Sequence, residues 1–375
     1  RGHGSRSRQL TPSTASATQV PSTKRNVGAP IALWYNESRR GPDQRARDRR
    51  KAGCSPKGVA GRIVVTGGSV IQYQVERMSP KRRFMSALFG GRVDRPALGN
   101  PTSVATVENM DLVGASFPEA NIDPVKMADL AATGYEVFKF DSVMPVYSTI
   151  IEAAALGCEI DWGTKDWLPI NRSSPWQDPS DVEIPSDFLE RQPIKAVLEC
   201  IEILRHRYGD RVAIIGKVMG PWTMGYHMKG VQEFLINVLL DPDQVRAFLE
   251  KLLPISIIFG KAQIQAGADV LMVADHTTGD LVRAETYRDF LLPIHKILNQ
   301  ELQCPTILHC CGRTLDRMQY FAEAGFDWLI LDTEHGPYDV LTAQRMLQAV
   351  GGRCPCVVRV PSLEEVWIKK ALDIG

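Results

Sequence analysis

A histidine and two cysteines stand together at the end of a short apolar run, and these side chains can bind a metal. In the stretch 306–313, two apolar residues lead into His309, Cys310 and Cys311, and a glycine follows. The pattern predicts a buried strand with soft metal ligands at its carboxyl end. Because side chains alternate between the two faces of a strand, His309 and Cys311 should point one way and Cys310 the other. A His-x-Cys pair can occupy two corners of a tetrahedral zinc site, and a reduced pair of core cysteines beside a histidine is the alternative.

The elements that must position these ligands belong to a repeated unit. At 266–275 and again at 324–332, a helix end with a glycine is followed by a buried strand and then by an aspartate. A helix, a glycine cap and a buried strand form the βα unit of a parallel sheet. Its repetition along the chain from residue 78 favours an α/β fold of the (β/α)8 TIM barrel type over an open doubly wound sheet. No Gly-x-Gly-x-x-Gly follows a predicted strand, which speaks against dinucleotide binding.

Polar residues at the carboxyl ends of barrel strands converge on one rim, where enzymes of this fold have their active sites. Asp141 follows a predicted strand at 137–140, and Asp275 follows another at 270–273. We therefore predict that Asp141 and Asp275 bind substrate beside His309. Further strands are predicted at 100–107, 212–218, 328–331 and 356–360, and helices at 79–89, 123–133, 186–208, 231–239, 242–265 and 340–350.

The composition is typical of a globular protein without a membrane segment. Hydrophobic residues make up 44% of the 375 residues and charged residues 23%. No apolar run reaches the ~20 residues that a membrane-spanning helix needs, and the first residues lack the apolar core of a secretory signal. Eight cysteines without a regular framework are typical of a reducing compartment. We therefore predict a cytoplasmic protein that does not bind a membrane.

The net charge of +1 hides two regions of opposite sign. Residues 1–77 hold 15 Lys and Arg against 4 Asp and Glu, whereas residues 78–375 hold 29 against 39. The first region has no periodic apolar pattern and is predicted to be a disordered basic leader. A basic tail for nucleic acid or membrane, a transit peptide and an artefact of the sequence are the interpretations left open. The acidic remainder argues against nucleic acid as a partner.

Several motifs between residues 78 and 325 carry a resemblance to a known family. They are Asn100-Pro-Thr-Ser-Val-Ala-Thr106, Ala154-Ala-Leu-Gly-Cys-Glu-Ile-Asp-Trp-Gly-Thr-Lys165, Gly220-Pro-Trp-Thr223, Thr278-Gly-Asp280 and His309-Cys-Cys311. In these motifs the chain resembles the cobamide-dependent methyltransferases of the uroporphyrinogen decarboxylase superfamily. The resemblance implies a barrel in which zinc, held by His309, Cys311 and a distant Cys, activates a thiol, with Cys310 as a bystander. Zinc stabilises a thiolate at neutral pH. The resemblance also implies a methylcobamide donor on a corrinoid protein and a small thiol acceptor such as coenzyme M.

The same superfamily contains uroporphyrinogen decarboxylase itself, a lyase of porphyrin biosynthesis that uses no metal. Its substrate carries many carboxylates, which call for Arg and Lys side chains in the site. The Arg-bearing loop of that family should fall near residues 100–108, where this chain has neither Arg nor Lys. A decarboxylase is therefore the weaker alternative.

The last part of the chain resembles a second family. Its motifs are Gly325-Phe-Asp-Trp-Leu-Ile-Leu-Asp-Thr-Glu-His-Gly-Pro337, Pro355-Cys-Val-Val-Arg-Val-Pro361 and Ile368-Lys-Lys-Ala-Leu-Asp-Ile-Gly375. They are similar to motifs of the class II pyruvate aldolases (HpcH/HpaI type) related to 4-hydroxy-2-oxo-heptanedioate aldolase. By this resemblance His335 is a general base, Asp373 its carboxylate partner, and Arg359 the group that holds the pyruvate enolate. The metal-binding Glu and Asp of that family would lie beyond the last residue.

Neither resemblance is complete, so we predict a barrel that is incomplete or chimeric at its C-terminal end. Residues 1–77 form the leader, residues 78–325 the methyltransferase-like barrel, and residues 326–375 an aldolase-like βα fragment that completes or caps it. The fragment should dock beside the strand of His309 and bring His335 to the same rim. The third zinc ligand stays open. Methyl transfer is the leading function, and a 2-oxo acid aldolase and an inactive truncated chimera are alternatives.

Overall fold

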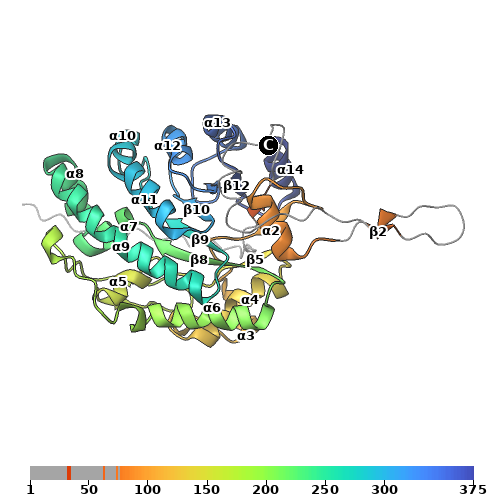
Figure 1. The fold of residues 1–375 in the computed structure, drawn as a ribbon, viewed down its shortest axis with the longest axis horizontal. Helices are drawn as coiled ribbons and strands as arrows, with labels where there is room; N and C mark the ends of the chain where they lie inside the picture. Colours follow the sequence, from red (N-terminus) through yellow and green to blue (C-terminus); the bar gives the residue numbers. More distant parts are fainter. Residues whose placement is uncertain (1–31, 35–61, 64–72, 75–76) are drawn as a thin grey trace, which may run out of the picture.

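The sheet at the centre of the molecule is built from parallel strands that follow the order of the sequence. The computed structural model describes residues 32–34, 62–63, 73–74 and 77–375, so most of the predicted leader lies outside the described residues. The parallel strands are β5 Ser142–Val143, β8 Ala213–Met219, β9 Val270–Ala274, β10 Thr306–His309, β11 Trp328–Asp332 and β12 Cys356–Arg359. Figure 1 shows the helices arranged around this curled sheet. Successive parallel strands joined by outer helices are the construction of a βα barrel.

Two further strands extend the sheet toward a closed ring. β1 Ala32–Trp34 pairs antiparallel with β12, and β4 Ala97–Gly99 pairs antiparallel with β1, so β4 runs parallel to the other six. At the far edge the N–H of Asp141 donates to the carbonyl oxygen of Leu98 at 2.7 Å, which joins β4 to the start of β5. The predicted α/β fold of the TIM-barrel type is confirmed, with β1 as an antiparallel member. Two small hairpins lie outside the sheet, β2 Arg62–Ile63 with β3 Tyr73–Gln74 and β6 Ile160–Asp161 with β7 Ile170–Asn171.

Helices with good caps begin where the sequence predicts. The Ser79 side chain accepts the N–H of Arg82, and the Asp123 side chain accepts the N–H groups of Val125 and Lys126. The α-helices are α2 Pro80–Leu88, α3 Val107–Val113, α4 Pro124–Glu136, α5 Ile151–Ala155, α6 Ile194–Tyr208, α7 Pro221–Lys229, α8 Val231–Leu240, α9 Pro242–Ala266, α10 Ala284–Thr286, α11 Leu292–Leu302, α12 Met318–Glu323, α13 Val340–Val350 and α14 Glu365–Asp373. Short helical turns are η2 Glu119–Asn121, η3 Pro179–Asp181, η4 Phe188–Glu190, η5 Tyr287–Leu291 and η6 Leu315–Arg317. In the described part of the chain, no helix combines the length and the apolar character needed to cross a membrane.

The predicted strand at 137–140 is wrong, because the chain makes a turn there. The N–H groups of Val137 and Phe138 both donate back to the carbonyl oxygen of Thr133, at 2.9 and 3.1 Å. Lys139 has a φ of 58°, in the left-handed region. These features end α4 and delay the strand, so β5 begins after Asp141 rather than before it.

The predicted strand at 100–107 is also wrong. The side-chain oxygen of Asn100 accepts the N–H groups of Thr102 at 3.0 Å and Ser103 at 3.2 Å. A side-chain bond of this kind replaces a backbone turn. The strand is therefore confined to β4, which ends before Asn100, and α3 follows after the turn.

The aldolase-like end of the chain lies within the same sheet as the preceding part. β11 pairs in parallel with β10, and β12 with β11. Trp328 on β11 is 1% exposed, and its indole N–H donates to the carbonyl oxygen of Leu88 at 3.0 Å. Its ring also contacts that of Phe84, with centroids 5.3 Å apart. The end of the chain thus packs on α2, near the start of the described region, while the division into 78–325 and 326–375 stays a prediction.

Candidate metal centre

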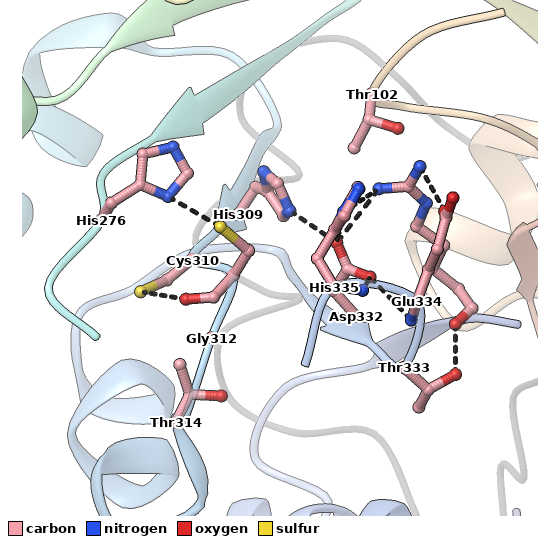
Figure 2. Close-up of polar contacts among 12 residues, drawn as sticks. Thr102, His276, His309, Cys310, Gly312, Thr314, Asp332, Thr333, Glu334 and His335 are labelled. Carbon is pink, nitrogen blue, oxygen red and sulfur yellow. Dashed lines mark hydrogen bonds and ion pairs between the residues drawn. The ribbon is translucent and has the colours of Figure 1, made fainter. Parts of the chain in front are cut away.

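The imidazole of His309 lies at the carboxyl end of β10 with one nitrogen already bonded. Its Nε2 is 3.2 Å from Oδ2 of Asp332, at the end of the neighbouring strand β11 (Figure 2). Burial lowers the pKa of His309, so the ring is neutral at pH 7. A carboxylate only accepts hydrogen bonds, so Nε2 carries the ring proton and Nδ1 keeps a lone pair. A histidine held in this way by a carboxylate is typical of metal ligands.

The two cysteines after His309 lie in different surroundings. Cys310 is 4% exposed and belongs to the apolar core, where burial raises the pKa of its thiol well above the usual value. Cys311 is partly exposed, and its Sγ is 3.4 Å from Nδ1 of His276. Burial also raises the pKa of Cys311. Of the two thiols, Cys311 is therefore the one placed to act at the rim.

His276 is a residue that the sequence did not single out as a ligand. It follows β9 with one residue between, and β9 pairs with β10 so that Ala274 lies opposite His309. The rings of His276 and His309 meet edge to face, with centroids 5.7 Å apart. Burial and the neighbouring His309 lower the pKa of His276 to about 3, which keeps this ring neutral as well. The signal in the sequence is a second histidine just past the end of a predicted neighbouring strand.

Asp275 lies at this rim, but protein groups occupy its carboxylate. Its Oδ1 accepts the N–H of Thr223 at 2.8 Å and the hydroxyl of the same residue at 3.0 Å, and its Oδ2 is 2.9 Å from Nε2 of His295. Gly220 passes so close that a Cβ there would lie 2.2 Å from the carboxyl carbon. Asp275 is 1% exposed. We therefore correct the predicted substrate contact: this aspartate anchors the start of α7 and positions His276.

Asp332 is the electrostatic centre of the rim. Besides His309 it is bonded to Nδ1 of His335 and Nη1 of Arg359, each at 3.1 Å, and it accepts the N–H groups of Glu334 and His335 at 3.0 Å. Burial alone would raise the pKa of Asp332, but the bonds from His309 and His335 and the charge of Arg359 hold it well below its usual value. The bond to Asp332 raises the pKa of His335 in return. Asp332 is thus a fixed anion that orients three cationic or polar side chains (Figure 2).

One set of three potential ligands at the rim is poorly suited to a metal. Among the described residues, Asp332, Glu334 and His335 are the one set whose ligand atoms all lie within 4.8 Å of one another. The guanidinium of Arg359 lies between them, because its Nη1 is 3.1 Å from Asp332 and its Nη2 pairs with Glu334. A second cation at this point would meet the positive charge of Arg359.

The residues of the His-x-Cys motif fit zinc by donor type. His309 and Cys311 offer imidazole nitrogen and thiolate sulfur, which are the donors that zinc takes most often in proteins. Both lie at the rim where barrel enzymes have their sites. Asp332 supplies the outer carboxylate that ligating histidines usually have. The donor types of His309 and Cys311, with Asp332 behind the histidine, are therefore compatible with zinc.

Asp141 is not at this rim, and its predicted substrate role is corrected. It precedes β5, and its carbonyl oxygen accepts the N–H of Ala213 at the start of β8, so it lies at the amino ends of the strands. Its side chain is 0% exposed and pairs with Arg83 at 2.5 Å and with Arg95 at 2.9 Å. The turn that displaced the predicted strand also moved this aspartate to the opposite end of the barrel, where it joins β4, β5 and α2.

The three residues of the aldolase resemblance are not assembled. Nδ1 of His335 is 2.9 Å from Nη1 of Arg359, so these two do share the rim. Asp373 is exposed at the last residue of α14, whose 9 residues lead away from the carboxyl end of β12. A helix of that length covers ~13 Å. The carboxylate bonded to His335 in the described part of the chain is Asp332 rather than Asp373, and a role for Asp373 stays a prediction.

Comparisons with known proteins agree with the fold and with the motif. A family model described as uroporphyrinogen decarboxylase (URO-D) matches residues 79–359. A methylated-thiol–coenzyme M methyltransferase of Methanosarcina mazei is 37% identical over 260 residues, which are 69% of this chain and 71% of that protein. A methylcobamide:CoM methyltransferase of Methanosarcina barkeri is 33% identical over 284 residues, 75% of this chain and 82% of that protein. A solved methyltransferase from Methanosarcina mazei superposes with a TM-score of 0.74 at 30% identity, covering 80% of this chain and 91% of that one.

A short second match corresponds to the other resemblance. A 5-keto-4-deoxy-D-glucarate aldolase of an Enterobacter species is 57% identical over 53 residues, which are only 14% of this chain and 21% of that protein. Both family resemblances found in the sequence are thereby confirmed, with the aldolase as the minor one. The extent of the family match, the identity to the methyltransferases and the shared fold show that this chain belongs to the uroporphyrinogen decarboxylase (URO-D) family.

Proposed function

We propose that this protein is a zinc-dependent methyltransferase that moves a methyl group from a methylcobamide to a thiol such as coenzyme M. The observation that carries the proposal is the carboxyl end of β10, where His309 and Cys311 face a rim that holds the histidine in a fixed orientation. The named activities of the relatives support it, because both Methanosarcina proteins are coenzyme M methyltransferases at 37% and 33% identity.

The side chains of the rim prepare the site for this chemistry. Zinc bound at His309 and Cys311 would keep the sulfur of a bound thiol ionised at neutral pH. Asp332 holds Nε2 of His309 and leaves Nδ1 available, and burial keeps the ring neutral. Because burial raises the pKa of Cys311, this thiol loses its proton only when a metal binds.

The proposed transfer has two substrates that meet at the rim. The thiol loses its S–H proton to solvent, and an electron pair of its sulfur forms the new bond to the methyl carbon. The carbon–cobalt bond breaks, and both of its electrons stay on cobalt. The donor would be delivered by a corrinoid protein, which is the proposed partner. The seven described cysteines are all free thiols, which supports a reducing, cytoplasmic setting.

The other functions have less support. A decarboxylase of uroporphyrinogen needs cationic side chains for the substrate carboxylates, and the stretch 100–108 offers none. An aldolase is supported only by a match over 14% of this chain and 21% of the aldolase, and the carboxylate beside His335 is Asp332 rather than the expected Asp373. The chimeric, inactive product is the alternative that the following experiment addresses directly.

Thiol binding tests the proposal on the intact protein. We expect zinc-loaded protein to bind coenzyme M and to release about one proton per thiol at pH 7, since free thiols have a pKa of about 8.5 and zinc-bound thiols are ionised. Calorimetry in two buffers with different ionisation enthalpies measures the proton. Metal-free protein is the control and should not bind the thiol. Equal thiol binding with and without zinc would contradict the proposal.

A further inference from the structure

We propose that Lys217 binds the anionic group of the thiol acceptor, so that the acceptor's sulfur stays at the rim and its acidic end lies deeper in the barrel. The inference rests on the proposed function, because it concerns the same thiol. It narrows the acceptor to small thiols that carry an acidic group at the end of a short chain. The sequence did not single out Lys217, because one lysine within an apolar run is not a recognisable motif.

The side chain of Lys217 points into the barrel. Lys217 lies within β8, and the preceding Gly216 faces the outer helix α9, because a Cβ there would lie 2.6 Å from Oε1 of Gln263. Side chains alternate between the two faces of a strand, so Lys217 faces inward. Gln263 also holds the backbone of Lys217. Its Oε1 accepts the N–H at 2.9 Å, and its Nε2 donates to the carbonyl oxygen at 2.7 Å.

The register of the sheet puts this lysine one layer below the His-x-Cys motif. Met219 and His309 both lie opposite Ala274 of β9, whereas Lys217 lies opposite Met272. Residues at one level of a parallel sheet point to the same face, and so do residues two positions apart, so His309 and Lys217 both face the interior. The two layers are about 6–7 Å apart along the strands. A small thiol with its sulfur at the rim can therefore extend its other end toward the lysine.

The ammonium group of Lys217 has donors to spare. The residue is 5% exposed, and its Nζ is 3.4 Å from the carbonyl oxygen of Val146. An ammonium has three N–H donors, and among the described residues this long hydrogen bond is joined by no ion pair. The buried Arg83 and Arg359 differ, because each has a carboxylate oxygen within hydrogen-bond distance. Burying a cation without such a partner is costly, and a bound anion would supply the partner.

Glu152 compensates the charge of Lys217 only in part. Its Oε1 accepts the N–H of Met219 at 2.7 Å, and the residue is 2% exposed. Burial raises the pKa of Glu152 to about 7, so this carboxyl group is not fully ionised at neutral pH. Burial lowers the pKa of Lys217 to about 8, although Glu152 acts in the opposite direction, so the amine still carries its charge at pH 7. The barrel interior thus keeps a net attraction for an anion.

The charge of Lys217 reaches the rim, where the thiol is proposed to bind. Burial is the main cause of the lowered pKa of His276 and of His309, and the charge of Lys217 contributes to the lowering in both. The other cation of the rim, Arg359, is already paired with Asp332 and Glu334. Lys217 is therefore the better partner for an acidic group.

Two thiols of equal chain length test the assignment. Coenzyme M carries a sulfonate two carbons from its sulfur, and 2-mercaptoethanol carries a neutral hydroxyl in the same place. We expect the wild type to have the lower KM for coenzyme M. Lys217→Met should raise that KM by about 10–100-fold, because a charge-assisted hydrogen bond is lost, and should leave the KM for 2-mercaptoethanol nearly unchanged. Equal KM values for both thiols in the wild type would overturn the inference whether or not the variant folds.

Lys229→Met is the matched control for this variant. Lys229 is also a buried lysine, but it lies on α7 and its Nζ donates to the carbonyl oxygen of Gln177. Its substitution should leave the preference for coenzyme M as in the wild type. Lys217→Met replaces a buried cation by an apolar side chain of similar length, so its stability in urea should not fall. A loss of stability with an unchanged preference would mean that the lysine is structural and would overturn the inference.

Binding of ethanesulfonate separates this inference from the proposed function, because this anion has no thiol. Calorimetry should show binding to the wild type and binding at least about 10-fold weaker to Lys217→Met. If the protein transfers no methyl group but binds ethanesulfonate through Lys217, the proposed function fails alone. If the protein transfers methyl groups and Lys217→Met keeps the wild-type preference and the wild-type affinity for ethanesulfonate, this inference fails alone.

Discussion

Replacing Cys311 by Ser should abolish zinc binding and methyl transfer, whereas Cys310→Ser should keep both. Cys311 is partly exposed and lies 3.4 Å from His276 at the rim, while Cys310 is 4% exposed and packs in the core. A serine hydroxyl does not ionise near neutral pH and is a much weaker zinc ligand than a thiolate. Metal content after dialysis and transfer rate at saturating substrates measure the two effects.

The two variants control for each other because they make the same chemical change in adjacent residues. Cys310→Ser buries a hydroxyl in apolar surroundings, so its cost should appear as about 1–3 kcal/mol of lost stability rather than as lost metal. Equal loss of zinc in both variants would contradict the assignment of Cys311 as the ligand. If both variants keep their full zinc content, the cysteines of the His-x-Cys motif do not bind the metal.

Replacing Asp332 by Asn should affect both the metal and the stability of the fold. The carboxylate is 0% exposed and pairs with Arg359, whose side chain is 9% exposed. Removing one partner of a buried ion pair costs about 3–5 kcal/mol of stability. Here Glu334 still neutralises part of the charge of Arg359 after the substitution. We therefore expect a loss near the lower end, about 3 kcal/mol, in urea unfolding of the metal-free protein. Zinc affinity should fall by about 10–100-fold, because His309 loses its orienting carboxylate.

His335→Ala is the control for this second prediction. The imidazole of His335 is 56% exposed and is bonded to the same carboxylate. Its removal leaves Asp332 with His309 and Arg359, so stability should change by less than about 1 kcal/mol and zinc affinity only slightly. If both variants lose similar stability and zinc affinity, Asp332 has no role in orienting His309 that is separate from its bond to His335. Wild-type zinc affinity in Asp332→Asn would show that the carboxylate does not orient His309.

Elements with a strong period or a clear cap were predictable from the sequence. The predicted helix at 340–350 has the bounds of α13, where the Asp339 side chain caps the helix by accepting the N–H of Thr342 at 2.7 Å. The strand at 270–273 matches β9 apart from one further residue. In both cases local chemistry and burial lead to the same element, so the sequence alone is sufficient.

Short apolar runs predicted strands less reliably, because the same residues can be buried in a turn. The run at 137–140 has the composition of a strand. In the structure the rings of Phe138 and Phe140 stack on each other, with centroids 5.4 Å apart and planes at 24°. Apolar surface is thus buried without a strand, and nothing in the local sequence distinguishes the two outcomes. The misplacement of Asp141 follows from this single error.

The site was predictable along one strand but not across strands. His309 is the last residue of β10 and Cys311 follows two residues later, so their spacing in the sequence is sufficient to pair them. The proximity of His276 depends on the register of β9 with β10, and that of Asp332 on β11 lying next to β10. Register is set by the packing of the whole barrel and cannot be read from a motif. The pairing of His335 with Asp332 instead of Asp373 is likewise a property of how the chain folds after β11.

Methyl transfer itself is the measurement that tests the central claim most directly. Zinc-loaded protein is mixed anaerobically with methylcobalamin and coenzyme M, and the cobalt spectrum is followed while the methylated thiol is quantified. The account predicts that reduced cobalamin with both electrons on cobalt and methylated coenzyme M appear in equal amounts. Metal-free protein and the Cys311→Ser variant should form neither. Fully zinc-loaded protein that leaves methylcobalamin unchanged, or metal-free protein that turns it over at the same rate, would contradict the account.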